Sequence, residues 1–185
     1  EIMEWTIARD RWQQHLKTRG TFYSDWAAKL DTLHRQQPEN GADAAAAALR
    51  TLAALLERCR LDRLTRHQHI LFRLGELIAH AEAAAIFAER VCDKATTAIA
   101  LDVPTRQALS RLFARDAALK VADGVRWVSA AGSPDETLLA QLPALYRSYN
   151  GQIADMDFAA AQLNQAFGVS QHSELVLDMK CCARN

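Results

Sequence analysis

The feature that most constrains this chain is the long apolar-periodic stretch in its middle. From Thr65 to about Thr97 the sequence keeps a helical period without a proline, and after Asp102-Val103-Pro104 the period resumes and runs to Gly132. Two helices of this length, joined by so short a break, pack side by side as an antiparallel hairpin. The sequence therefore predicts an all-α fold, an antiparallel helical bundle of about six helices built on a long central hairpin.

Start and stop signals place three helices before the hairpin. Gly20 is expected to end the first helix as its C′ residue, and the second helix should end before the loop at 37–41. Asp43 is expected to cap a third, alanine-rich helix. The predicted core stripes of the three helices are Ile2, Trp5, Trp12 and Leu16; Phe22, Trp26, Leu30 and Leu33; and Leu49, Leu52, Leu56 and Cys59.

The hairpin itself has clear boundaries. Thr65 with Gln68 forms a capping box and is the expected N-cap of its first helix, while Asp102 and Pro104 open the second and Gly132 closes it. The predicted stripes are Ile70, Leu74, Leu77, Ile78, Ala81, Ala85, Ala88, Cys92 and Ala95, and then Leu109, Leu112, Phe113, Ala117, Val121, Val125 and Val128.

The last third of the chain is less regular. Ser133-Pro134-Asp135-Glu136 should open a helix with a serine N-cap and proline at N1, and Pro143 should kink or split the stripe Leu138, Leu142, Leu145 and Tyr149. A final amphipathic helix is expected to end at Gly168, before a tail without a firm period. Its predicted apolar stripe is Ile153, Met156, Ala160, Leu163 and Phe167.

Length and charge limit the range of functions. We expect one bundle over 1–185, with N-terminal helices at 1–40, a main bundle at 42–167 and a tail at 168–185. Lys plus Arg and Asp plus Glu number 22 each, so no overall field attracts nucleic acid. No apolar run approaches the about 18 residues that span a bilayer. The chain begins without methionine and enters a helical period almost at once, which is typical of a piece of a longer protein.

The four cysteines lack zinc-site spacing. Cys59 and Cys92 fall on apolar helix faces, where a reduced thiol packs as a small hydrophobe, so we expect a reducing, cytoplasmic setting. The vicinal pair Cys181 and Cys182 could bind metal or form a strained disulfide, but a frayed terminus is the favoured interpretation.

Polar residues on the hairpin are the candidates for chemistry. His67, His69, Glu76, His80 and Glu82 gather on the first helix, but no second helix offers the matching Glu/His pair of a di-iron site, so a polar face is favoured over a metal site.

On the second hairpin helix, Arg111, Arg115, Asp116 and Lys120 have the spacing of surface ion pairs. A buried Asp116 bonded to Arg73 across the hairpin is the alternative. Because no phosphate loop, nucleophile elbow or triad is visible, we assign no catalytic, cofactor-binding or metal residue.

Two segments of the hairpin nevertheless resemble a known family. Residues 69–84 (HILFRLGELIAHAEAA) and 112–122 (LFARDAALKVA) are similar to paired helices in the C-terminal bundle of acyl-CoA dehydrogenases. In that family a glycine-rich flavin-contacting segment and the catalytic glutamate follow. Here 127–134 read WVSAAGSP, without either motif. The chain thus resembles the extra helical domain appended to dehydrogenases of the very-long-chain type.

The resemblance implies a non-catalytic structural or oligomerisation domain of a flavoenzyme that oxidises fatty acyl-CoA. FAD would belong to the parent enzyme, and the implied partners are its catalytic core, a second copy in a dimer, or a membrane surface. One alternative is a stand-alone interaction module that uses the tryptophan-bearing first helix. The other is a peripheral membrane domain that binds through the helix at 43–60, whose polar face carries Arg50, Arg58 and Arg60.

Overall fold

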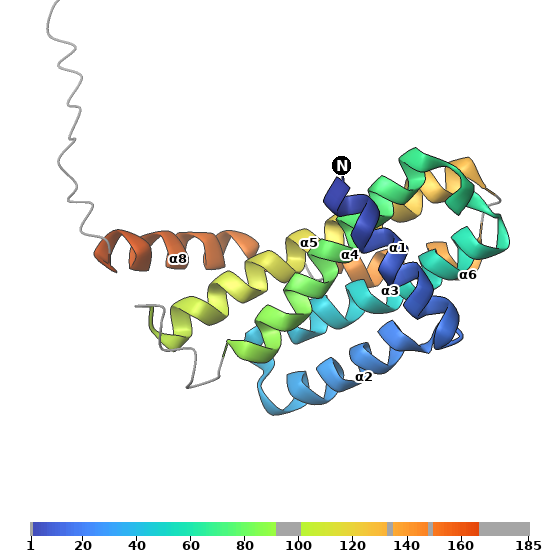
Figure 1. Ribbon diagram of the computed structural model, residues 1–185. Coiled ribbons are helices and arrows are strands. Elements are labelled where there is room, and N and C mark those ends of the chain that lie inside the picture. The colour runs from blue at the N-terminus through green and yellow to red at the C-terminus, as the bar shows by residue number, and fades with distance from the viewer. Residues whose placement is uncertain (1, 92–100, 133–134, 148–149, 167–185) are drawn as a thin grey trace, which may run out of the picture.

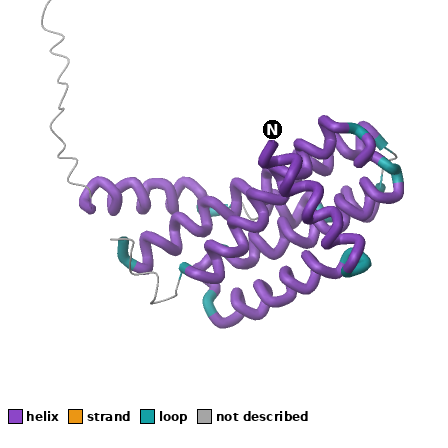
Figure 2. The backbone as a smooth tube through the Cα atoms, in the orientation of Figure 1, coloured by secondary structure: helices purple, strands orange, loops and turns teal. Residues whose placement is uncertain are grey.

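A computed structural model describes residues 2–91, 101–132, 135–147 and 150–166, and across these ranges the chain is helical with no strand, which confirms the all-α prediction (Figures 1 and 2). Among them are six helices of 15 residues or more. The elements are α1 (Ile2–Lys17), α2 (Thr21–Gln36), η1 (Pro38–Asn40), α3 (Ala42–Leu61), η2 (Leu64–Arg66), α4 (Gln68–Arg90), α5 (Val103–Ala131), α6 (Glu136–Leu139), α7 (Leu142–Arg147) and α8 (Gln152–Ala166).

The predicted hairpin is present as α4 and α5, which lie side by side (Figure 1). Its antiparallel sense follows from the register of contacts. The ring of Phe87 lies 6.5 Å from that of Phe113, and nearer the start of α4 the Glu76 carboxylate lies 3.9 Å from the Lys120 ammonium. Moving toward the N-terminus of α4 therefore corresponds to moving toward the C-terminus of α5, so the two helices are antiparallel. The predicted stripe of α4 is buried from Ile70 to Ala88, while Cys92 and Ala95 lie outside the described residues.

The centre of the bundle is α3 rather than the hairpin. This helix packs against α2, α4 and α5 together, and its predicted core residues are all buried, as are most of its alanines. Alanine supplies high helix propensity and lets neighbouring backbones approach closely. One apolar cluster runs continuously through α2, α3, α4 and α5, and the short α6 and α7 each add one buried leucine to it, Leu138 and Leu145. The helices α1 and α8 pack on the outside of this cluster.

Several helix ends follow the local signals, although the turn after α1 differs from the prediction by one residue. Arg19, with φ +52°, is the left-handed C′ residue and donates its N–H to the carbonyl of Leu16 at 3.2 Å, while Gly20, with φ +85°, comes next and donates to the carbonyl of His15 at 2.8 Å. The Asp102 carboxylate accepts the N–H of Thr105 at 2.9 Å and caps α5, which ends before Gly132. The stripe containing Pro143 is split into α6 and α7, with the proline in the first turn of α7.

Three N-cap predictions were wrong. Thr65 lies in η2, and α4 begins after His67 without a side-chain cap. Asp43 lies inside the first turn of α3, whose N-cap is Gly41. The cap of α6 is Asp135, whose side chain accepts the N–H groups of Thr137 and Leu138. In each case another nearby residue occupied the cap position, because several adjacent residues could begin the same helix.

The outer helices face differently from the prediction. In α1 the buried residues are Ala8 and His15, with Ile7 and Trp12 partly covered, whereas Ile2, Trp5 and Leu16 are exposed. In α8 the buried residues are Asp155 and Ala159, and the predicted stripe residues Ile153 and Met156 face outward. Phe167 and the tail lie outside the described residues. Each of these helices has one principal neighbour, α4 for α1 and α5 for α8.

Candidate functional site

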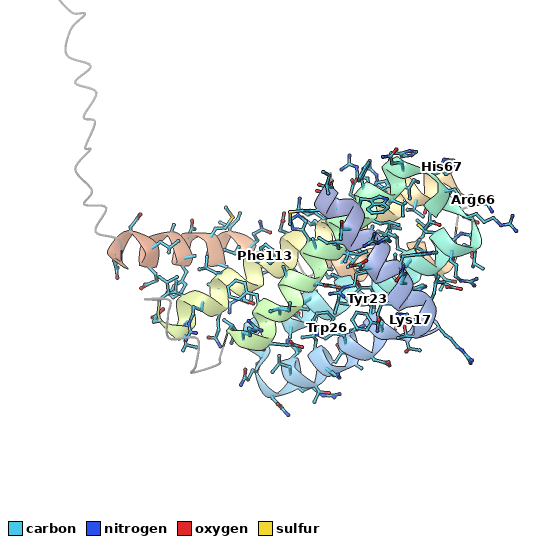
Figure 3. All side chains as sticks on the ribbon, in the orientation of Figure 1. Lys17, Tyr23, Trp26, Arg66, His67 and Phe113 are labelled. Atoms are coloured by element: carbon cyan, nitrogen blue, oxygen red, sulfur yellow. The ribbon has the colours of Figure 1, made fainter. Side chains whose placement is uncertain are left out.

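The histidines and carboxylates of α4 are spread out rather than gathered. His67 and His69 are exposed near the start of the helix, and Figure 3 shows His67 beside Arg66 at the edge of the molecule. His80 lies near the ring of Phe113, and Glu76 pairs with Arg73 at 3.4 Å. Within the described ranges, no three His, Cys, Asp or Glu side chains form a group that could hold a metal ion.

Glu82 is the exception on α4, because it joins three helices. Arg11 of α1 donates to it through Nε at 2.5 Å and Nη2 at 2.8 Å, and the hydroxyl of Tyr23 on α2 donates at 2.7 Å. Tyr23 is buried, and burial together with the Glu82 charge raises its pKa. The Glu82 carboxylate is therefore committed to structural bonds. Trp26, which Figure 3 labels near Tyr23, donates its indole N–H to Glu89 at 2.7 Å.

An open groove of about 830 Å³ lies where α1 turns into α2, beside α3, the connection between α6 and α7, and α7 itself. The one buried titratable side chain in its lining is His15, whose Nε2 lies 3.3 Å from Oε2 of Glu57. The hydrogen bond from Arg60, and in smaller part that from His15, lowers the pKa of Glu57 despite partial burial. Arg19 and Asp25 also line the groove. The groove thus mixes charges of both signs and does not select one charge of ligand.

Two arginines of α5 form a largely buried ionic cluster with a carboxylate of α8, and this corrects the surface-pair prediction. Arg111 donates to Asp155 of α8 through Nε at 3.0 Å and Nη2 at 2.5 Å, and Arg115 bonds to the same carboxylate. Asp116 is exposed and Arg73 pairs within α4, so the predicted bond between these two is not formed. The sequence pattern indicated neighbours along α5, but the partner lies 40 or more residues away.

The arginines proposed for membrane contact are paired with carboxylates. Arg50 bonds to Asp31 at 2.7 Å, Arg58 bonds to Asp62, and Arg60 bonds to Glu57 at 2.6 Å. The apolar face of α3 lies in the core, so this helix cannot insert into a membrane surface while the bundle keeps this fold. No described helix combines the length and the apolar character needed to cross a bilayer.

An uncovered apolar patch lies where the start of α1 crosses the start of α4. Ile2 is 85% exposed, and a hollow of about 300 Å³ beside it is lined by Ile2, Trp5, Gln68 and Phe72; Met3, next along α1, is 76% exposed. We call Ile2, Met3, Trp5 and Phe72 the α1–α4 patch. An exposed group of large apolar side chains is typical of a contact surface.

The cysteine prediction is tested at one position. Cys59 is buried, and burial together with the charge of Asp62 raises its pKa to about 12, so this thiol packs as a hydrophobe. Cys92, Cys181 and Cys182 lie outside the described residues.

Comparisons with protein-family models, with curated proteins and with solved structures found no match to this chain.

Proposed function

We propose that this chain is a non-catalytic helical domain of an acyl-CoA dehydrogenase-like flavoenzyme, and that it packs through the α1–α4 patch against the catalytic core of the parent enzyme or a second copy. Support comes from the residues 69–84 and 112–122, which lie on the two neighbouring helices α4 and α5. The carboxylates of Glu82, Asp155 and Asp62 are engaged by arginines. FAD and the oxidation of fatty acyl-CoA belong to the parent enzyme in this proposal.

The observation that carries the proposal is the exposed α1–α4 patch. A bundle that functions alone in water gains nothing by leaving Ile2 and Trp5 exposed at a hollow and Met3 exposed next to them in sequence, whereas a contact surface needs such anchors. A stand-alone interaction module is the second candidate, because it would use the same patch. A cytoplasmic location remains a prediction for either candidate.

Binding to the separately expressed catalytic core, followed by calorimetry, tests the contact. Trp5→Ser should weaken the affinity roughly tenfold or more, because tryptophan is a frequent anchor of interfaces. Val103→Ser is the matched control, since Val103 is 40% exposed at the start of α5, the end of the antiparallel hairpin opposite the patch, and should leave the affinity unchanged. Equal affinities for wild type and Trp5→Ser would show that the α1–α4 patch is not part of the interface with the catalytic core.

The gene and the flavin spectrum separate the two candidates. A dehydrogenase coding region directly upstream would support the appended domain, whereas a start codon immediately before Glu1 would support the stand-alone module. Stoichiometric flavin absorbance with acyl-CoA oxidation by the isolated chain would contradict the non-catalytic assignment.

A further inference from the structure

The helix α8 is docked with its polar side inward. Its two buried residues are Asp155 and Ala159, whereas Ile153 is 75% exposed and Met156 is 51% exposed. The usual amphipathic helix buries the apolar stripe and exposes the charges. Of the described residues of the predicted apolar stripe, Ala160 is exposed as well and only Leu163 is half-buried, so the stripe contributes little to holding this helix on the bundle.

A two-arginine contact holds α8 instead. Both oxygens of Asp155 are bonded by Arg111, and Arg115 one turn further along α5 bonds to Oδ2. Arg111 is itself positioned by η1, donating to the carbonyl of Glu39 at 2.6 Å and lying 3.2 Å from its carboxylate. Asp43 of α3 adds a further negative charge that acts on Arg111. Burial alone would raise the pKa of Asp155, but the two arginines outweigh it and lower the pKa.

The contacts that hold α8 are confined largely to one neighbouring helix. The principal neighbour of α8 is α5, and the continuous core cluster contains no residue of α8. A helix attached in this way can leave without opening the core, because opening free energies differ between parts of one fold. Replacing the charge on one side of a buried ion pair leaves the other side uncompensated, so such contacts fail abruptly.

We propose that α8 is a releasable arm, held on the bundle by an ionic latch of Asp155 with Arg111 and Arg115 rather than by an apolar seam. The inference does not depend on the proposed function. Release exposes both arginines and frees the helix that carries Ile153 and Met156, while α2 to α5 stay folded.

Hydrogen exchange of the full chain, followed by mass spectrometry, tests the latch. Asp155→Asn keeps the shape of the side chain and removes its charge, and it should speed exchange in peptides from α8 by about tenfold or more, with peptides from α3 unchanged. Asp157→Asn is the matched control, because Asp157 is an exposed aspartate on the same helix. It should leave exchange in α8 as in the wild type.

Two further measurements complete the test. If Arg111→Gln and Asp155→Asn remove the same contact, the double variant should exchange little faster in α8 than either single variant. In the wild-type chain, raising NaCl from low concentration to about 1 M should speed exchange in α8 only modestly, because a buried ion pair is screened less than an exposed one, and should not change exchange in α3. Unchanged α8 exchange in Asp155→Asn, or an equal loss of protection in α3 and α8, would overturn the latch.

Discussion

At the scale of single residues, Gly75 determines how closely α1 approaches the bundle. A Cβ at this position would overlap the carbonyl oxygen of Glu4 and would lie 2.7 Å and 2.9 Å from the Glu4 carbonyl carbon and Cα. These are backbone atoms, so they cannot move aside as a side chain can. At Gly124 of α5 the nearest atom to an added Cβ is the end of the Leu77 side chain, which can change rotamer.

We therefore predict that Gly75→Ala destabilises the chain by about 1–3 kcal/mol, because the added methyl forces α1 away from α4. Gly124→Ala should cost less, since the helix propensity of alanine offsets part of the crowding at Leu77. Urea unfolding of both variants, with the free energy extrapolated to water, measures the difference. A Gly75→Ala variant as stable as the wild type would show that α1 does not make this close contact.

At the scale of helices, the first turn decides where each element begins. Asp102 caps α5, and its hydrogen bonds with Thr105 lower its pKa. Asp43 also occupies the start of a helix, yet it caps nothing because Gly41 holds that position. Two aspartates with similar sequence signals thus have different structural roles.

Asp102→Ala should lower the midpoint of thermal unfolding at pH 7 more than Asp43→Ala does, because only the first loses a cap. The folded pKa of Asp102 lies below its ordinary value of 3.8, so the charged cap stabilises α5 above that pH. This contribution disappears as the pH falls through the lower folded value. The difference between wild type and Asp102→Ala should therefore shrink at about pH 3. A difference that is constant from pH 7 to pH 3 would contradict the capping role.

At the scale of the whole molecule, polar contacts join the outer helices to an apolar centre. Glu82 connects α1, α2 and α4 through Arg11 and Tyr23, and Asp155 connects α8 to α5. The apolar cluster explains why the inner helices hold together, but it does not by itself determine the positions of α1 and α8. Hydrogen bonds to the buried carboxylates fix these positions, because leaving a buried carboxylate unpaired costs free energy.

We predict that Glu82→Gln destabilises the chain by about 1–3 kcal/mol, since it removes the charge that Arg11 and Tyr23 share. Glu89→Gln is the control, because its bond to Trp26 is exposed and its loss should cost less than about 0.5 kcal/mol. Chemical denaturation followed by tryptophan fluorescence measures both. Equal stabilities of the two variants would show that the Glu82 contacts add nothing to the bundle.

The sequence predicted the positions of the helices better than it predicted which face of each helix is buried. Gly20, Asp102 and Pro143 act within a turn of their own positions, so their signals could be interpreted locally. The partners of Arg111, Glu82 and His15 lie 42 to 72 residues away along the chain, and a pattern that repeats every few residues carries no information about contacts at such separations. The ionic latch and the Glu82 contacts were therefore missed as sites.

By itself, the sequence determined that the chain is helical, roughly where its helices begin and end, and that α4 and α5 pair, because propensity, caps and short connections act over a few residues. Only the tertiary structure decided that α3 is the central helix and that α8 turns its apolar stripe outward. An amphipathic pattern shows that a helix has two faces. Which face is covered depends on the neighbours that the fold supplies, and here two arginines on α5 outweighed the apolar stripe of α8.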